Sequence, residues 1–229
     1  MVACLPLRAA VLIHDFTLRG TLADRLGAGS LTAVGGQITA LGYVSALNQG
    51  LTLASPTMSN GNYSVEFSFR LGAAVGSMKL LDLHGLNDST GLFVSNGQLA
   101  FSPLAVTSNA TLASGRENHV VLTRDGATGV VRGFLNGQQA FAFADPAGVG
   151  IVTPAGLLNF FREIPVSSPD LGQANTLTGI RVYNGALSSA EIGNLYAAMV
   201  AVPEPSVVML LLSGLGAAAV TLLRRRRRE

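Results

Sequence analysis

Between residues 63 and 69, apolar side chains occupy every second position and polar side chains lie between them. The apolar set is Tyr63, Val65, Phe67 and Phe69, and the polar set is Ser64, Glu66 and Ser68. Successive side chains of a β-strand point to opposite faces of its sheet, so this alternation predicts a strand with one buried face. Strand patterns dominate residues 11–199, and the body of the chain is therefore expected to be rich in β-structure.

Turn residues separate these patterns. Asn96-Gly97 and Asn136-Gly137 lie between apolar runs, and the segment 125–129 holds two glycines that can take positive φ, as β-hairpin loops require. Short strands joined by such turns predict an all-β, antiparallel sandwich. Residues 144–175 are expected to be rich in loops because of their prolines and glycines. The expected strands are 14–18, 63–69, 78–83, 91–94, 98–101, 119–124, 130–135, 138–143 and 178–183.

One segment of the body has a helical pattern, residues 188–196. Ser188 followed by Glu191 three positions later is typical of a capping box at a helix N-terminus. The apolar positions that follow helical spacing are Leu187, Ile192, Leu195 and Tyr196.

The pattern changes after residue 201. Val-Pro-Glu-Pro-Ser at 202–206 is followed by seventeen uncharged residues, 207–223, and then by five arginines. As a helix the uncharged run would be about 25 Å long, at the short end of what crosses a bilayer. We therefore expect a single C-terminal transmembrane helix, stopped on the cytosolic side by its basic cluster. The cluster consists of Arg224, Arg225, Arg226, Arg227 and Arg228.

Two other interpretations of the tail are weaker. In a helix of a globular core, five adjacent arginines would repel one another without a partner. A nucleic-acid-binding tail is disfavoured by the single basic block and its lack of aromatic residues. Without these arginines and Glu229, the chain carries ten basic and twelve acidic residues, so the body is slightly acidic and the pI near 9.0 comes from the tail. We predict no nucleic-acid partner.

The first ten residues are too short for the charged and apolar regions of a signal peptide. We interpret residues 1–10 as the remnant of a truncated signal peptide whose start lies upstream. Cys4 is the only cysteine, so no internal disulfide is expected. Only three residues precede it, too few for a lipoprotein signal.

The tail resembles the PEP-CTERM sorting signal of Gram-negative bacteria in the order, spacing and position of its parts. The residues that carry the motif are Val202, Pro203, Glu204 and Pro205. The resemblance implies an inner-membrane precursor that an exosortase cuts at or near Pro203–Pro205, and a product at the cell surface or outside the cell. It also implies an association with exopolysaccharide and biofilm matrix. The two prolines disfavour a helix, which leaves an extended segment for a protease to hold.

The body resembles a laminin-G-like, concanavalin A-like domain. The segment 115–138 is similar to the centre of that family, 177–196 to its C-terminal strand and capped turn, and 15–29 to its opening strand. The resemblance implies a jelly-roll β-sandwich over residues 11–199, followed by the sorting signal at 202–229. The chain departs from the family in having no Trp, the residue on which many of its members stack sugars.

The sequence shows no catalytic constellation. A glucanase of this fold needs carboxylates on alternate positions of one strand, and Glu66 is alone on its strand. The three histidines, His14, His84 and His119, show no metal spacing. We therefore predict that the protein is not an enzyme.

Calcium is the one metal that the sequence suggests. Laminin-G-like domains often hold Ca²⁺ at the rim, which makes Asp82, Asn87 and Asp88 candidate ligands, with Asp145 in another loop. The competing interpretation is that these are solvated turn residues.

The predicted function is that of an exported, non-enzymatic surface or matrix protein whose sandwich binds glycan or another matrix component. The alternatives are an extracellular glycan-active hydrolase and a purely structural module.

Overall fold

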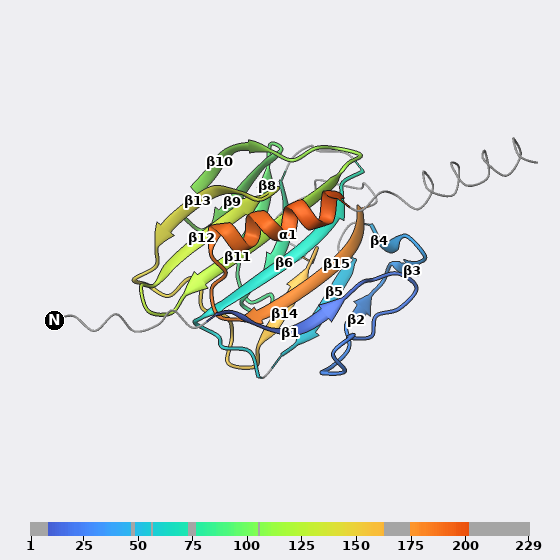
Figure 1. The fold of residues 1–229 in the computed structure, drawn as a ribbon, viewed down its shortest axis with the longest axis horizontal. Coiled ribbons are helices and arrows are strands. Elements are labelled where there is room, and N and C mark those ends of the chain that lie inside the picture. The colour runs from blue at the N-terminus through green and yellow to red at the C-terminus, as the bar shows by residue number, and fades with distance from the viewer. Residues whose placement is uncertain are drawn as a thin grey trace, which may run out of the picture.

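A computed structural model describes residues 9–46, 49–55, 57–72, 77–104, 106–162 and 175–201. In this part of the chain two antiparallel sheets pack face to face, and one helix, α1 (Ser189–Ala201), lies across the outer face of the larger sheet (Figure 1). This architecture confirms the predicted concanavalin A-like sandwich.

The larger sheet has eight strands in the order β13-β12-β11-β6-β15-β4-β3, with β1 paired to the C-terminal half of β15. Its long central strands are β6, β11 and β15, which bring residues far apart in the sequence side by side. The bounds are β1 (Val11–Phe16), β3 (Gln37–Thr39), β4 (Gly42–Ser45), β6 (Tyr63–Arg70), β11 (Glu117–Asp125), β12 (Val130–Leu135), β13 (Gln138–Ala144) and β15 (Asn175–Asn184).

The smaller sheet has seven strands in the order β10-β9-β8-β7-β14-β5-β2. Strand β14 joins β7 to β5, so that residue 159 lies opposite residue 82 although 77 positions separate them. The bounds are β2 (Thr32–Val34), β5 (Gly50–Ala54), β7 (Ser77–Asp82), β8 (Gly91–Ser95), β9 (Gln98–Ser102), β10 (Val106–Thr111) and β14 (Leu157–Phe160).

The core lies between the two sheets and follows the alternation seen in the sequence. Tyr63, Val65, Phe67 and Phe69 are fully buried in it, while Ser64, Glu66 and Ser68 belong to the outer face of the larger sheet. The Phe67 ring packs edge-on against Phe160 of the opposite sheet, with 5.7 Å between ring centroids, a preferred arrangement of aromatic pairs. The pattern thus selects which face of each strand is buried.

Helix α1 begins where the capping box predicts. The Ser188 backbone N–H and hydroxyl both donate to Glu191 Oε2 at 2.7 Å, and the Glu191 N–H donates back to the Ser188 hydroxyl at 3.3 Å. The helix buries Ile192 against a small cluster on the larger sheet, joined by Leu195 and Leu187. The helix continues to Ala201, five residues beyond the predicted segment.

The expected strands are all present, with ends shifted by a few residues. The sequence did not predict β2 to β5 or β10, and it placed β14 within a loop-rich stretch. Strands β2 and β3 have three residues each and are mostly exposed, so they show no alternation. Strand β14 consists of three apolar residues and Asn159 between glycines and prolines, and it becomes a strand only by pairing with β5 and β7.

Candidate functional site

The predicted sorting residues, Val202–Pro205 and the arginines 224–228, lie outside the described residues, as do residues 1–8 of the predicted signal remnant. Within the described part of the chain, no helix combines the length and apolar character needed to cross a membrane.

The candidate calcium ligands lie at the end of β7 and in the loop after it, and calcium binding there stays a prediction. Asp82 is fully buried; one of its oxygens accepts from the Lys79 ammonium at 2.9 Å and the other from the Leu86 N–H at 2.8 Å. Asp88 is paired with His84 at 2.8 Å, and the Asn87 side chain donates to a backbone carbonyl. Calcium requires several oxygens converging on one point. Among the described residues, no three acidic, histidine or cysteine side chains converge in this way.

Glu66 is the best-buried carboxylate of the larger sheet's outer face. Oε1 accepts from His119 Nε2 at 3.0 Å and from Arg181 Nη1 at 3.1 Å, and Oε2 accepts from the Tyr183 hydroxyl at 2.7 Å. Burial alone would raise the pKa of Glu66, but the hydrogen bond from His119, the charge of Arg181 and the hydrogen bond from Tyr183 together hold it below its usual value. A general acid must keep its proton near neutral pH, and this carboxylate is held ionised. Its role is to bind β6, β11 and β15 together.

A second cluster has the contacts of a serine-hydrolase triad. His14 Nδ1 lies 2.6 Å from Asp24 Oδ2, and His14 Nε2 lies 2.7 Å from Ser55 Oγ. Because the carboxylate can only accept, Nδ1 carries a hydrogen. In the neutral imidazole Nε2 then accepts from the serine, which is the arrangement that activates a serine nucleophile. The sequence analysis missed this cluster, since the residues are 10 and 41 positions apart and match no local motif.

This triad differs from a catalytic one because its serine and histidine are buried. Ser55 is 0% exposed and His14 is 2% exposed, so no substrate reaches the hydroxyl. Burial would raise the pKa of Asp24, but the backbone N–H groups of Asp15 and Leu26, together with His14, lower it below its usual value. The triad therefore fixes the loop after β1 to the end of β5.

A third cluster covers part of the outer face of the smaller sheet. Lys79, Asp82 and Asn159 are each at most 3% exposed. The Lys79 ammonium also lies 5.3 Å from the centre of the Phe93 ring, within the range of a cation–π contact. Asn159 continues the network to Thr52 and Arg162.

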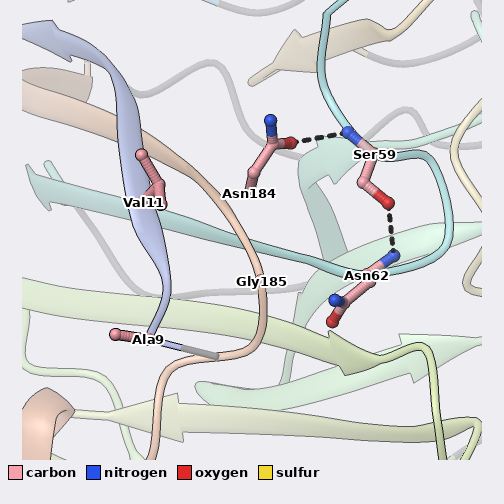
Figure 2. A pocket seen from close by; sticks show the side chains of 6 residues that line it. All are labelled: Ala9, Val11, Ser59, Asn62, Asn184 and Gly185. Atoms are coloured by element: carbon pink, nitrogen blue, oxygen red, sulfur yellow. Dashed lines mark hydrogen bonds between the residues drawn. The ribbon is translucent and has the colours of Figure 1, made fainter. Parts of the chain in front are cut away.

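A pocket of about 410 Å³ opens at one end of the sandwich (Figure 2). It is lined by Ala9, Val11, Ser59, Asn62, Asn184 and Gly185, which come from the start of β1, the loop before β6 and the end of β15. Hydrogen bonds fix the wall: Asn184 Oδ1 accepts from the Ser59 N–H at 2.6 Å, and Ser59 Oγ accepts from the Asn62 N–H at 3.2 Å. Among the described residues, the lining presents amide, hydroxyl and apolar groups and no charged side chain.

The sequence analysis did not single out these pocket residues. Asn62 and the Asn184-Gly185 pair adjoin strand ends, and antiparallel pairing of β6 with β15 places Asn184 opposite Tyr63. The sequence signal that could have indicated this pocket is the presence of turn residues, asparagine and glycine, at the ends of two strands that pair with each other.

Comparisons with known families match both parts of the chain. Residues 45–193 match the family described as the concanavalin A-like lectin/glucanases superfamily, and residues 201–228 match the PEP-CTERM protein-sorting motif. No curated protein matches the chain.

Solved structures with the same fold include parts of an arabinanase, a sialidase and a neurotoxin. Domain 4 of AbnA, an extracellular arabinanase from Geobacillus stearothermophilus in complex with arabinotriose, superposes with a TM-score of 0.60 at 19% identity over 82% of this chain and 98% of that domain. The Trypanosoma rangeli sialidase in complex with sialic acid gives 0.63 at 15% identity over 83% of this chain. The binding domain of botulinum neurotoxin serotype D gives 0.61 at 12% identity over 83% of this chain. The chain spans about a third of the sialidase structure and half of the neurotoxin one, and these identities establish the fold alone.

Proposed function

Since this chain belongs to the concanavalin A-like lectin/glucanases superfamily and ends in a PEP-CTERM sorting motif, we propose that it is an exported, non-enzymatic surface protein that binds glycan. In this proposal an exosortase cuts at or near Pro203–Pro205. The sandwich then remains at the cell surface or in the extracellular matrix, where exopolysaccharide is the partner.

The chemistry of the tail supports export. An apolar run that precedes five arginines orients its basic end toward the cytosol, so the sandwich faces the opposite side of the membrane. Without the terminal arginines and Glu229 the chain carries ten basic and twelve acidic residues, and this slight excess of negative charge suits an aqueous exterior.

The absence of catalysis is supported by the state of the buried polar clusters. The Glu66 carboxylate is held by Arg181, His119 and Tyr183, and the Ser55 hydroxyl is closed to solvent. Neither group, as arranged, provides the solvent-facing acid or nucleophile that glycan hydrolysis or deacylation requires.

The proposed binding role depends most on the pocket of Figure 2, whose described lining residues offer polar but uncharged side chains. Its volume, about 410 Å³, falls within the range of small-ligand sites. Asn62 is exposed, and its side-chain amide can both donate to and accept from a sugar hydroxyl. Val11 and Ala9 supply apolar contact for the C–H face of a sugar ring. The binding is expected to be weak because no Trp is available for stacking.

The test is glycan-array binding and calorimetry with exopolysaccharide fragments. Asn62→Ala should weaken binding about tenfold, the effect of losing roughly 1.4 kcal/mol of hydrogen bonding. Asn194→Ala, at an exposed position of α1, is the matched control and should bind as the wild type does. Equal loss in both variants, or binding that is unchanged in Asn62→Ala, would move the site away from the pocket. Release of new reducing ends from the fragments would favour the hydrolase alternative.

A further inference from the structure

The smaller sheet carries the parts of a reaction between two of its own side chains. Lys79 on β7 and Asn159 on β14 contact the two oxygens of one carboxylate, Asp82. The Lys79 ammonium donates to Oδ2 at 2.9 Å, and the Asn159 amide nitrogen donates to Oδ1 at 3.3 Å. Lys79 is the only lysine in the chain, and the other residues of the Lys/Arg class are all arginines.

The orientation of the Asn159 amide is fixed by its neighbours. Its oxygen accepts from the Thr52 hydroxyl at 2.8 Å and from Arg162 Nη1 at 3.0 Å. A guanidinium can only donate and a carboxylate can only accept, so the oxygen must face Arg162 and the nitrogen must face Asp82. The amide carbonyl is therefore polarised by a cation and a hydroxyl, the kind of donor pair that stabilises a developing oxyanion.

We propose that Lys79 and Asn159 join in an intramolecular isopeptide bond. Asp82 takes a proton from the Lys79 ammonium along their hydrogen bond, which the burial of both groups favours because it leaves neither charged. The free amine attacks Cγ of Asn159, and the negative charge moves to the oxygen held by Thr52 and Arg162. Asp82 returns this proton to the leaving nitrogen, the C–N bond to that nitrogen breaks, and ammonia departs. The attacking nitrogen gives its extra proton to Asp82, and that proton leaves with the ammonia as ammonium. The product is one Nζ–Cγ amide, and no oxidant or cofactor is consumed.

Burial favours this reaction, whereas burial of Ser55 keeps external substrates away from its hydroxyl. The nucleophile and the electrophile belong to one chain, so no substrate has to enter. Exclusion of water protects the amide from hydrolysis and strengthens the action of the Arg162 charge on the carbonyl. The flexible stem of Lys79 lets the amine move from the carboxylate to the adjacent Cγ.

The bond would suit a protein without an internal disulfide. Only one cysteine is present. Strands β7 and β14 are contributed by segments 80 positions apart, and a link between them closes a long loop of the chain across the centre of the smaller sheet.

The test is tryptic peptide mapping of the full-length chain, taken in detergent from the membranes of a host that lacks the processing protease. The wild type should have lost one ammonia, should resist cleavage after Lys79, and should give residues 71–116 joined to residues 133–162. Separate peptides 71–79, 80–116 and 133–162 with an intact Asn159 would overturn the proposal. Loss of ammonia with the link at any other pair of residues would overturn it as well.

Variants separate the roles of three residues, Lys79, Asp82 and Thr52. Lys79→Arg and Asp82→Asn should give no link, while Asp88→Asn, which changes a neighbouring carboxylate, should keep it. Thr52→Val should form the link at least a hundredfold more slowly, the usual cost of removing one oxyanion donor. A link that forms at the wild-type rate in Asp82→Asn would contradict the assignment of Asp82 as the acid–base group.

Discussion

Two buried clusters in this protein contain a nucleophile beside a base, and they differ in whether an electrophile is present. In the first, Ser55, His14 and Asp24 have the hydrogen bonds of a hydrolase triad, but among the described residues no side-chain amide is hydrogen-bonded to the serine, and its burial keeps external substrates out. In the second, the amine of Lys79 shares a carboxylate with the amide of Asn159, whose carbonyl is already polarised. The comparison teaches that burial prevents a cluster from acting on an external substrate, whereas it favours a reaction between two side chains of the same chain.

The largest expected effect concerns the second cluster. Lys79→Arg keeps the positive charge but cannot form the link, so it should lower the free energy of unfolding by about 4 kcal/mol, the entropy of closing a loop of this length. Calorimetry of both proteins measures the change. Equal stability of the two proteins, with a mapped link in the wild type, would show that the bond does not stabilise the fold.

Glu66 provides the reference for a cluster with no chemistry. Glu66→Gln leaves the buried His119 without its carboxylate and leaves Arg181 with its ion pair to Asp15 alone, and it should destabilise the sandwich by about 3 kcal/mol. Urea unfolding measures this loss. A loss below about 1 kcal/mol would mean that the ion pair is replaced by solvent at little cost.

The same variant predicts a pH dependence. The folded pKa of Glu66 lies below its usual value of 4.5, so its contribution is complete above pH 4.5 and is lost as the pH falls through the folded pKa. The stability difference between the wild type and Glu66→Gln should therefore shrink in acid below pH 4.5 and stay constant from there to neutrality. A difference that grows in acid would contradict this sign.

The smallest effect is expected in the first cluster. Ser55→Ala removes one hydrogen bond to His14 and should cost about 1 kcal/mol in a thermal melt. A fluorophosphonate probe should leave the native wild type unlabelled because the hydroxyl is buried. Labelling that disappears in Ser55→Ala would show that the cluster opens and acts as a nucleophile.

The sequence predicted what local patterns determine. Alternation from Tyr63 to Phe69 gave both the strand and its buried face, and Ser188 with Glu191 gave the start of α1. The prediction of β14 failed because a run of four residues, three of them apolar, among glycines and prolines has no period of its own. It becomes a strand when β5 and β7 pair with it.

The buried clusters were beyond local patterns for the same reason. Asp82 was singled out as a calcium ligand because it ends a strand beside a polar loop. The pairing of β7 with β14 places Asn159 beside Asp82, and Lys79, three positions before Asp82 on β7, forms an ion pair with Asp82. The residue types can be read from the sequence, but the pairing of strands from distant segments decides which side chains lie beside a carboxylate.

The central claim is that this sandwich is delivered to the cell surface and released from its membrane tail. The most direct measurement is the intact mass of the protein recovered from the surface of a host that possesses an exosortase. The account predicts a chain that ends at or near Pro203–Pro205 and lacks the apolar run and the arginines. A full-length chain with its terminal arginines, recovered from the cytosol of that host, would contradict it.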